Sequence, residues 1–333
     1  MRAWWYEESG SVDVLQFSDI ADLEPDAGEV RIRVAYSMTN PTDAKRRETG
    51  RDLTLFKRIV PNNDGSGVID KVGAGVDAAR IGERVWIFGA QSQRPWGTAA
   101  EFSVVPSNQA IKLPDNATLA QGACLGVPAV TAHCGLFADG PLTNKTVLVS
   151  GASGRVGAYG VQLAKWAGAA TVIGTAGSAE KLAYVQSLGA DHTIDYNDDR
   201  LVDTLLELTN GRGVDLVLDV AFAKTIQMAP QIIAANGVIT NYANDGGAME
   251  PTLPVFRDLM QKCITMRPYA IYTLPQERRD HAYRDITTCL SSGALSHRIV
   301  GPRPIEDMPN AHELVGQGKV FGCLLIEIDG SLS

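Results

Sequence analysis

A glycine-rich turn at residues 152–157 is the first place where residue types and spacing could do chemistry. It consists of Ala152, Ser153, Gly154, Arg155, Val156 and Gly157. The spacing is that of the dinucleotide fingerprint, with alanine at the first glycine position. Small residues allow a tight turn and a close approach of the backbone to a pyrophosphate, and the helix that follows presents N–H groups with no partner in the helix. An apolar stretch precedes the turn and a helix pattern follows it, so the sequence predicts a phosphate cradle.

The residues after the next apolar stretch bear on the choice between NAD and NADP. An acidic side chain there accepts hydrogen bonds from the ribose hydroxyls of NAD and repels a 2′-phosphate. The expected position is Thr175 or Ala176, and no acid is present. Ser178 can donate a hydrogen bond to a phosphate, Lys181 can supply a positive charge, and Tyr196 can close the pocket. We therefore expect NADPH, although Lys181 taken alone is more typical of a solvated helix face.

Three stretches together, residues 147–157, 174–181 and 189–196, resemble the medium-chain dehydrogenase/reductase superfamily. Within it, the sequence is most similar to the zinc-free quinone oxidoreductases, the zeta-crystallin-like branch. The similarity runs from Met1 to about Glu327. It implies an α/β protein with a GroES-like, partly open β-barrel domain and a doubly wound Rossmann domain with a parallel sheet.

The order of elements agrees with two domains. Residues 1–123 read as short strands separated by Pro, Gly and Asp turns, and residues 124–261 alternate strands with helices. In this second part the expected strands are 147–150, 171–174, 192–195, 216–219 and 238–241. The resemblance implies that residues 1–123 and 262–333 form the GroES-like substrate domain and that residues 124–261 form the NADPH-binding domain. A proline-containing helix around Pro128 is expected to join the two.

The sequence provides no set of zinc ligands. The five cysteines are scattered, with none before Cys124, and the five histidines show no ligand spacing, so we interpret the histidines as surface or packing residues. By the resemblance, the three ligands of a catalytic zinc would fall in residues 36–41, at Asn62 or Asn63, and near Val127. None of these is a competent ligand. We therefore expect no metal.

A hydride acceptor without zinc needs another donor for its developing negative charge. The resemblance places residues 40–45 and 60–67 beside the nicotinamide. Asn40, Lys45 and Asn63 are the available donors there, and Asp43 and Asp64 are positioned to orient them. We predict catalytic roles for Asn40, Asp43, Lys45 and Asn63; the alternative for each is that it only shapes its loop.

Further site residues follow from the resemblance. Near the cofactor it implies Pro128 and Thr131, and the strand ends add Ala221, Asn241 and Tyr242. Substrate contacts are expected from four aromatic residues: Tyr36, Trp96, Phe256 and Tyr269. Aromatic side chains at such places belong to a core at least as often as to a stacking surface.

The function implied by the resemblance is metal-free hydride transfer from NADPH to a quinone or a similar conjugated acceptor. A second reading is reduction of a C=C bond in an enone, enal or enoyl thioester. The phosphates of an acyl-CoA could then meet a basic patch of Lys45, Arg46, Arg47, Arg51, Lys57 and Arg58, whose alternative is a solvated surface. A third reading, from another class, is an NADPH-binding crystallin-like structural or sensor protein.

Composition is that of an ordinary globular protein. The 333 residues are 45% hydrophobic and 20% charged, and the net charge of -8 argues against nucleic acid or an anionic membrane as a partner. No apolar stretch reaches the length of a membrane span and no signal peptide is recognisable, so we expect a cytoplasmic protein. We also expect a homodimer that pairs edge strands of the second domain, with residues 238–242 and the segment that follows them as the candidate edge.

Overall fold

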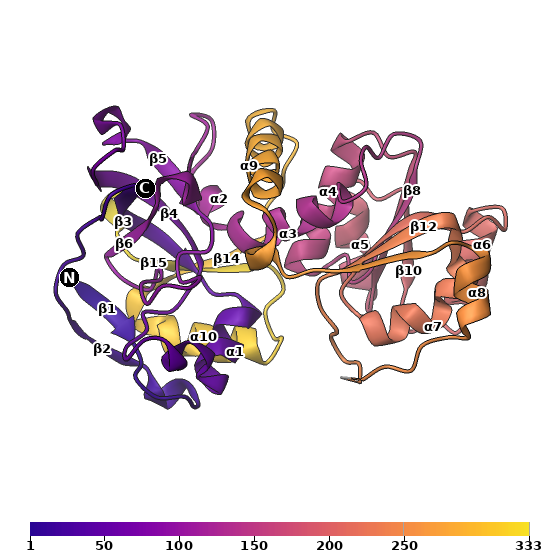
Figure 1. The fold of residues 1–333 in the computed structure, drawn as a ribbon, viewed down its shortest axis with the longest axis horizontal. Helices are drawn as coiled ribbons and strands as arrows, with labels where there is room; N and C mark the ends of the chain where they lie inside the picture. The colour runs from indigo at the N-terminus through magenta and orange to yellow at the C-terminus, as the bar shows by residue number, and fades with distance from the viewer. Residues whose placement is uncertain (249, 333) are drawn as a thin grey trace. The chain divides into compact units, whose positions relative to one another are not determined.

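The chain forms two compact units, each described here by itself. The computed structural model describes residues 1–248 and 250–332. Unit 1 comprises Met1–Val127 and His297–Ser333, and unit 2 comprises Pro128–Ser296 (Figure 1). The sequence had assigned residues 262–296 to the first domain. They belong to unit 2 instead, because β13 (Thr265–Pro268) extends the parallel sheet of that unit by pairing with β12 (Ile233–Asn241).

Unit 1 is built on a seven-stranded sheet. Its strands run in the order β14-β15-β3-β4-β5-β7, and β6 also pairs with β3. They are β3 (Glu29–Met38), β4 (Asp64–Val72), β5 (Arg84–Ile87), β6 (Phe102–Pro106), β7 (Ala110–Lys112), β14 (Ile299–Pro304) and β15 (Cys323–Glu327). Strand β3 pairs with β6 through residues 29–33 and with β15 through residues 36–38. The long strand β3 therefore joins the amino-terminal and carboxyl-terminal parts of the chain.

Apolar side chains from neighbouring strands form the core of this sheet. Val30, Ile32, Ile69, Val85 and Ile87 are buried in one cluster. Outside the sheet lie a hairpin and three α-helices: β1 (Arg2–Trp5), β2 (Gln16–Asp19), α1 (Pro41–Thr49), α2 (Leu119–Ala123) and α10 (Met308–Gly316). In a strand with one buried face, inward apolar residues alternate with outward polar ones, and this is the pattern that predicts such strands.

Unit 2 is a six-stranded sheet in which every pairing is parallel. Its order is β10-β9-β8-β11-β12-β13. The strands not yet given are β8 (Thr146–Val149), β9 (Thr171–Ala176), β10 (His192–Asp195) and β11 (Val214–Asp219). The predicted doubly wound parallel sheet is confirmed. Four of its five predicted strands match the observed strands to within two residues at each end. The fifth, β12, begins five residues earlier than predicted.

Helices cover both faces of this sheet (Figure 1). They are α3 (Gly126–Leu136), α4 (Arg155–Trp166), α5 (Ala179–Ser187), α6 (Leu201–Leu208), α7 (Phe222–Ile232), α8 (Phe256–Gln261) and α9 (Gln276–Ser291). On one face Leu205 of α6 and Ile226 of α7 join a buried cluster with strand residues. On the other, α4 lies so close that a Cβ on Gly160 would come within 2.6 Å of Leu218. Pro128 stands in the first turn of α3, where proline is tolerated, and not in the helix interior as expected.

Strand β12 lies inside the sheet, between β11 and β13. The prediction that residues 238–242 form an edge strand is therefore wrong. The terminal strands of the described sheet are β10 and β13. The sequence missed this because β13 is four residues long and carries a proline, a weak strand signal.

Leu218 tests how much unit 2 depends on the packing of its central strand. Leu218 lies on β11, and its fully buried side chain packs against α4. We expect Leu218→Ala to lower the free energy of unfolding by about 3 kcal/mol, because a cavity is left behind. Leu253→Ala, at a leucine that is 53% exposed, is the matched control and should change it by less than about 0.5 kcal/mol. Equal effects of the two substitutions in chemical denaturation would contradict this packing.

Candidate functional site

The glycine-rich turn of unit 2 has the backbone of a phosphate cradle. Gly151 adopts a φ of 63°, its carbonyl accepts a hydrogen bond from the N–H of Gly154 at 2.9 Å, and α4 begins at the next residue. A Cβ on Gly157 would lie 2.4 Å from that same carbonyl oxygen and 2.7 Å from Cα of Ala152. Only glycine fits there. The first-turn N–H groups of α4 have no acceptor in the helix, so the turn fits a pyrophosphate.

Residues after β9 lie beside this turn. The hydroxyl of Thr175 accepts a hydrogen bond from the N–H of Gly151 at 3.1 Å, which ties the two loops together. Ser178 is the N-cap of α5 and accepts from the N–H of Lys181. Tyr196 lies against Gly177, where an added Cβ would come within 2.3 Å of the phenol oxygen. Thr175 thus has a structural partner, while Ser178, Lys181 and Tyr196 surround the segment that follows it.

A buried carboxylate at the end of β11 organises the next loops. Asp219 accepts hydrogen bonds from the N–H of Ala221 at 3.0 Å, the hydroxyl of Thr225 at 2.6 Å and the amide of Asn241 at 3.0 Å. The same amide donates to the carbonyl of Ala243 at 2.7 Å. Burial raises the pKa of Asp219 above its ordinary value. The sequence predicts Asp219 only as a strand end, and its hydrogen bonds to Ala221 and Asn241 were not expected.

Tyr269, which was predicted to contact substrate, meets two residues that were predicted to contact the cofactor. Its hydroxyl donates to the carbonyl of Thr131 at 2.8 Å, and its ring lies 6.5 Å from that of Tyr242, edge to face. Burial raises the pKa of both phenols. The other aromatic candidate in this unit, Phe256, is 76% exposed at the start of α8.

Unit 1 holds a second cluster of polar residues, centred on two carboxyl groups. The amide of Asn40 donates to Oδ2 of Asp64 at 2.7 Å, and the N–H of Val127 donates to the same oxygen at 2.8 Å. The amide of Asn63 donates to Oδ1 of Asp43 at 2.6 Å, and the N–H of Asn40 to its Oδ2 at 2.8 Å. Asp43 belongs to the first turn of α1 and Asp64 begins β4. Three distant segments therefore meet at one point.

Burial sets the charge of this cluster. Asp64 is fully buried, and its pKa is raised well above the ordinary value by burial and by the nearby charge of Asp43. Burial also raises the pKa of Asp43, against hydrogen bonds that lower it. Oδ2 of Asp64 already accepts two N–H groups, so a proton on this carboxyl resides on Oδ1, which has no partner among residues 1–248 and 250–332. These surroundings favour the protonated form of Asp64.

A glycine makes room for that oxygen. A Cβ on Gly126 would lie 2.1 Å from Oδ1 of Asp64. The segments that the resemblance matched to zinc ligands, around Asn40, Asn63 and Val127, face the carboxyl groups with N–H donors. N–H groups repel a cation, so these residues do not fit a catalytic zinc. Sequence reasoning treated Asp64 as an orienting residue only; its place within a run of buried residues was the signal that it is central.

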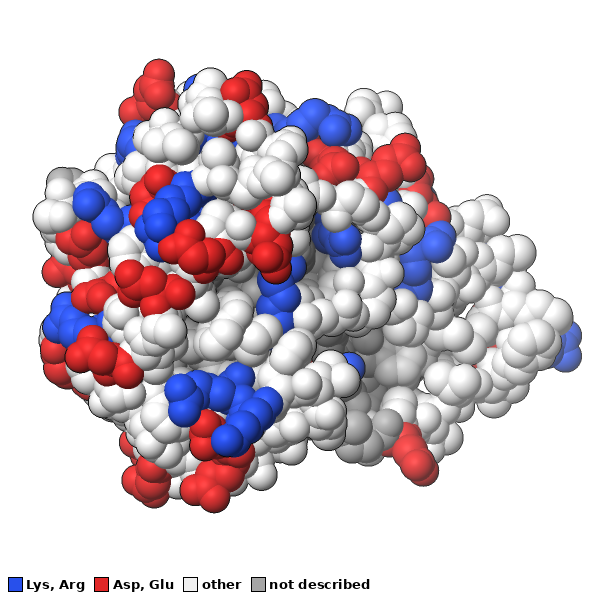
Figure 2. Space-filling model, turned by 60° about the vertical axis from the view of Figure 1, so that its left-hand side comes forward, with Lys and Arg blue, Asp and Glu red and all other residues white. Residues whose placement is uncertain are grey.

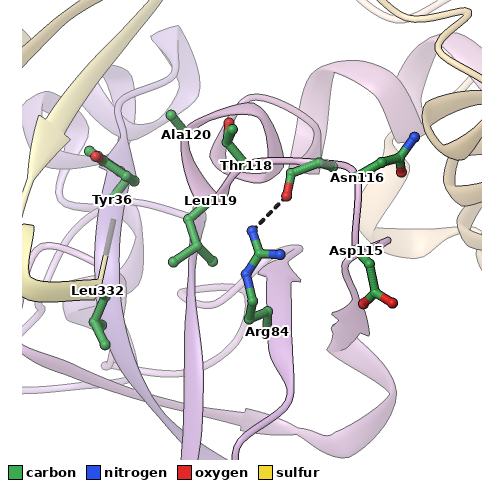
Figure 3. Close-up of a pocket in the computed structure, with 9 residues that line it drawn as sticks. Tyr36, Arg84, Asp115, Asn116, Thr118, Leu119, Ala120 and Leu332 are labelled. Carbon is green, nitrogen blue, oxygen red and sulfur yellow. Dashed lines mark hydrogen bonds between the residues drawn. The ribbon is translucent and has the colours of Figure 1, made fainter.

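The other candidates of unit 1 stand apart from this cluster. Lys45 is on the exposed side of α1. Trp96 packs against a core cluster of unit 1. Tyr36 lines a pocket of about 460 Å³ with eight other residues, shown in Figure 3: Arg84, Asp115, Asn116, Ala117, Thr118, Leu119, Ala120 and Leu332. Arg84, the cationic residue of that lining, donates to the carbonyl of Ala117 at 2.5 Å.

The predicted basic patch is largely engaged within the chain. Arg46 contacts Asp52, Arg47 is 1% exposed and contacts Glu48, and Arg58 pairs with Glu7. Lys45, Arg51 and Lys57 are exposed. On the face shown in Figure 2, acidic side chains stand beside most of the basic ones. A continuous cationic surface is not visible on that face.

Comparison with known proteins agrees with both folds. The family described as "Alcohol dehydrogenase GroES-like domain" matches residues 26–115, and "Zinc-binding dehydrogenase" matches residues 156–288. The quinone oxidoreductase of Rattus norvegicus is 28% identical over 98% of each chain. An NADPH-dependent alkenal/one oxidoreductase of Arabidopsis thaliana is 32% identical over 72% of this chain and 64% of its own. A mycobacterial protein solved in complex with NADPH superposes with a TM-score of 0.83, at 26% identity over 98% of this chain and 99% of its own.

Unit 1 therefore has the GroES-like fold and unit 2 the Rossmann fold that the sequence predicted. The chain belongs to the medium-chain dehydrogenase/reductase superfamily, in its zinc-independent quinone oxidoreductase branch. It is an oxidoreductase.

The raised pKa of Asp64 has a consequence for stability. A carboxyl whose pKa is raised on folding binds a proton that the unfolded chain releases, so stability falls as the pH rises from about 4 towards the folded pKa. Asp64→Asn keeps the acceptor and removes this proton. Over that pH range, we expect the free energy of unfolding to fall less steeply in the variant than in the wild type, by up to about 1.4 kcal/mol per pH unit.

The measurement is chemical denaturation at a series of pH values. Asp115→Asn, at an exposed aspartate of the same unit, is the matched control and should keep the wild-type slope. If Asp64→Asn and the wild type have the same slope, Asp64 is ionised in the folded protein.

Proposed function

We propose that this protein is an NADPH-dependent oxidoreductase that transfers a hydride to a quinone or a similar conjugated acceptor without a metal. The observation that carries the proposal is the phosphate cradle of residues 151–157, in which residue 157 has room for glycine alone. The loop between β9 and α5 adds to it, because that loop contains no acidic residue. The names of two relatives, a quinone oxidoreductase and a protein solved with NADPH, support it.

Residues of unit 2 would hold the cofactor. The turn at residues 152–157 would receive the pyrophosphate, and Ser178, Lys181 and Tyr196 the 2′-phosphate end. Thr175 would act by holding the turn in place. The loops of Ala221, Asn241 and Tyr242, together with Pro128 and Thr131 of α3, would continue the binding surface along the carboxyl ends of the strands. When bound, NADPH supplies the hydride.

The chain's own contribution is to position groups and to exclude water. Asp43 and Asp64 hold the amides of Asn40 and Asn63 in fixed orientations, and all four side chains are buried. A neutral Asp64 avoids adding a negative charge beside an acceptor that becomes negative. Lys45 remains a candidate donor. Tyr36, Trp96, Phe256 and Tyr269 remain the proposed substrate contacts, and the bonded hydroxyl of Tyr269 favours a packing role for its ring.

The second candidate is reduction of a conjugated C=C bond. The name of the alkenal/one oxidoreductase supports it. The internal contacts of Arg46, Arg47 and Arg58 leave fewer charges for the phosphates of an acyl-CoA, so a free enone or enal is the better substrate of this class.

A panel assay separates the two candidates. NADPH oxidation is followed with a simple quinone, an enone and a crotonyl thioester, and NADH is the control. Fast turnover of the quinone supports the first candidate. Turnover confined to the enone or the thioester assigns the protein to C=C reduction, and a preference for NADH would contradict the assignment of the β9 loop.

Lys181 provides the test of cofactor choice. We expect Lys181→Ala to raise the dissociation constant for NADPH about tenfold, because a charge-assisted contact with the 2′-phosphate is lost. Affinity for NADH should not change. Lys145→Ala, before the amino end of β8, is the control and should leave both affinities as they are. An equal loss for NADPH and NADH would show that Lys181 does not read the phosphate.

We also propose a homodimer in the cytoplasm. In unit 2 the edge strand β13 and the exposed apolar side chains of Val255, Phe256 and Met260 offer a surface for a second copy. None of the helices in the described part of the chain is long and apolar enough to span a bilayer. Light scattering at micromolar concentration tests the assembly, and the mass of a monomer would contradict it.

A further inference from the structure

Two histidines and an aspartate of unit 2 converge; one histidine comes from α3, and the other histidine and the aspartate come from α9. Nε2 of His133, on α3, lies 2.7 Å from Oδ2 of Asp285, and Nε2 of His281 lies 3.2 Å from the same oxygen. His281 and Asp285 are four residues apart on α9 and so share one face of that helix. The three ligand atoms all lie within 4.8 Å of one another.

We propose that His133, His281 and Asp285 form a binding site for a divalent transition metal, with Zn²⁺ as the ion of choice and water completing its coordination. Two imidazole nitrogens and one carboxylate oxygen are a ligand set that zinc commonly takes in proteins. Ligands at about 2.0 Å from a tetrahedral zinc lie roughly 3.3 Å apart. The side chain of His281 is 53% exposed, so its ring is able to move the short distance that this geometry requires.

The surroundings prepare the inner ligand. The His133 side chain is 1% exposed, and its ring stacks on Phe137 with 4.4 Å between centroids, which fixes the ring plane. Nδ1 of His133 has no hydrogen-bond partner in the described residues, so it is able to carry the ring proton and leave the lone pair of Nε2 for a metal.

The site is accessible to ions from the solvent, and a bound ion would stabilise unit 2. Asp285 is 23% exposed and His281 more so, while His133 forms the closed end. A bound ion would link α3 to α9, which are joined in sequence by about 140 residues, and so would stabilise unit 2. None of these three residues belongs to the proposed hydride-transfer machinery, so the inference stands or falls independently of the proposed function.

The experiment uses the full-length protein after removal of metals with a chelator. Zn²⁺ is titrated into the wild type and His281→Gln by calorimetry, and thermal unfolding is recorded with and without Zn²⁺. We expect one Zn²⁺ per chain in the wild type, binding at least tenfold weaker in His281→Gln, and a Zn²⁺-dependent rise of Tm in the wild type only. His281 is exposed, so this variant should fold; Asp285→Asn should weaken binding in the same way.

His192→Gln, at an exposed histidine on β10 of the same unit, is the matched control and should bind like the wild type. The proposal is overturned if the wild type takes up no Zn²⁺, or if all variants bind it equally, because binding would then come from scattered surface histidines.

Discussion

Parallel pairing of the six strands in unit 2 is the constraint on which the rest of that unit depends. Because all strands point the same way, every loop that follows a strand emerges at one edge of the sheet. The turn at residues 151–157 follows β8, the segment of Ser178 and Lys181 follows β9, and Asn241 ends β12. The parallel arrangement of the strands thus brings segments almost 100 residues apart in the chain to one surface.

Unit 1 solves a different problem, that of burying charge. Asp43 and Asp64 are both inside, and two full negative charges in that space would be very costly. The amides of Asn40 and Asn63 and the N–H of Val127 offset part of this cost. Burial and the charge of Asp43 also raise the pKa of Asp64, which favours its protonated form. By the sequence resemblance, other branches of the superfamily hold zinc ligands in the same segments. Here N–H donors face the two carboxyl groups instead.

Local patterns and long-range contacts differ in how well the sequence predicts them. The strands of unit 2 were found because buried parallel strands are continuous apolar runs, and the cradle because its glycines are locally required. The assignment of residues 262–296 failed because the short strand β13 has a weak local signal. The contact of Asn40 with Asp64, and the meeting of His133 with His281 and Asp285, depend on tertiary packing, which no spacing along the chain records.

Unit 2 is a single continuous stretch, whereas unit 1 needs both ends of the chain. During synthesis on a ribosome, all of unit 2 leaves the exit tunnel before β15. Strand β3 lacks its partner β15 until residue 327 has been added and has left the tunnel. Until then the carboxyl-terminal end of β3, residues 36–38, has one edge without its native neighbour. A nascent chain that stops short of β15 would present this edge to chaperones and proteases, although every residue of the nucleotide-binding sheet is already in place.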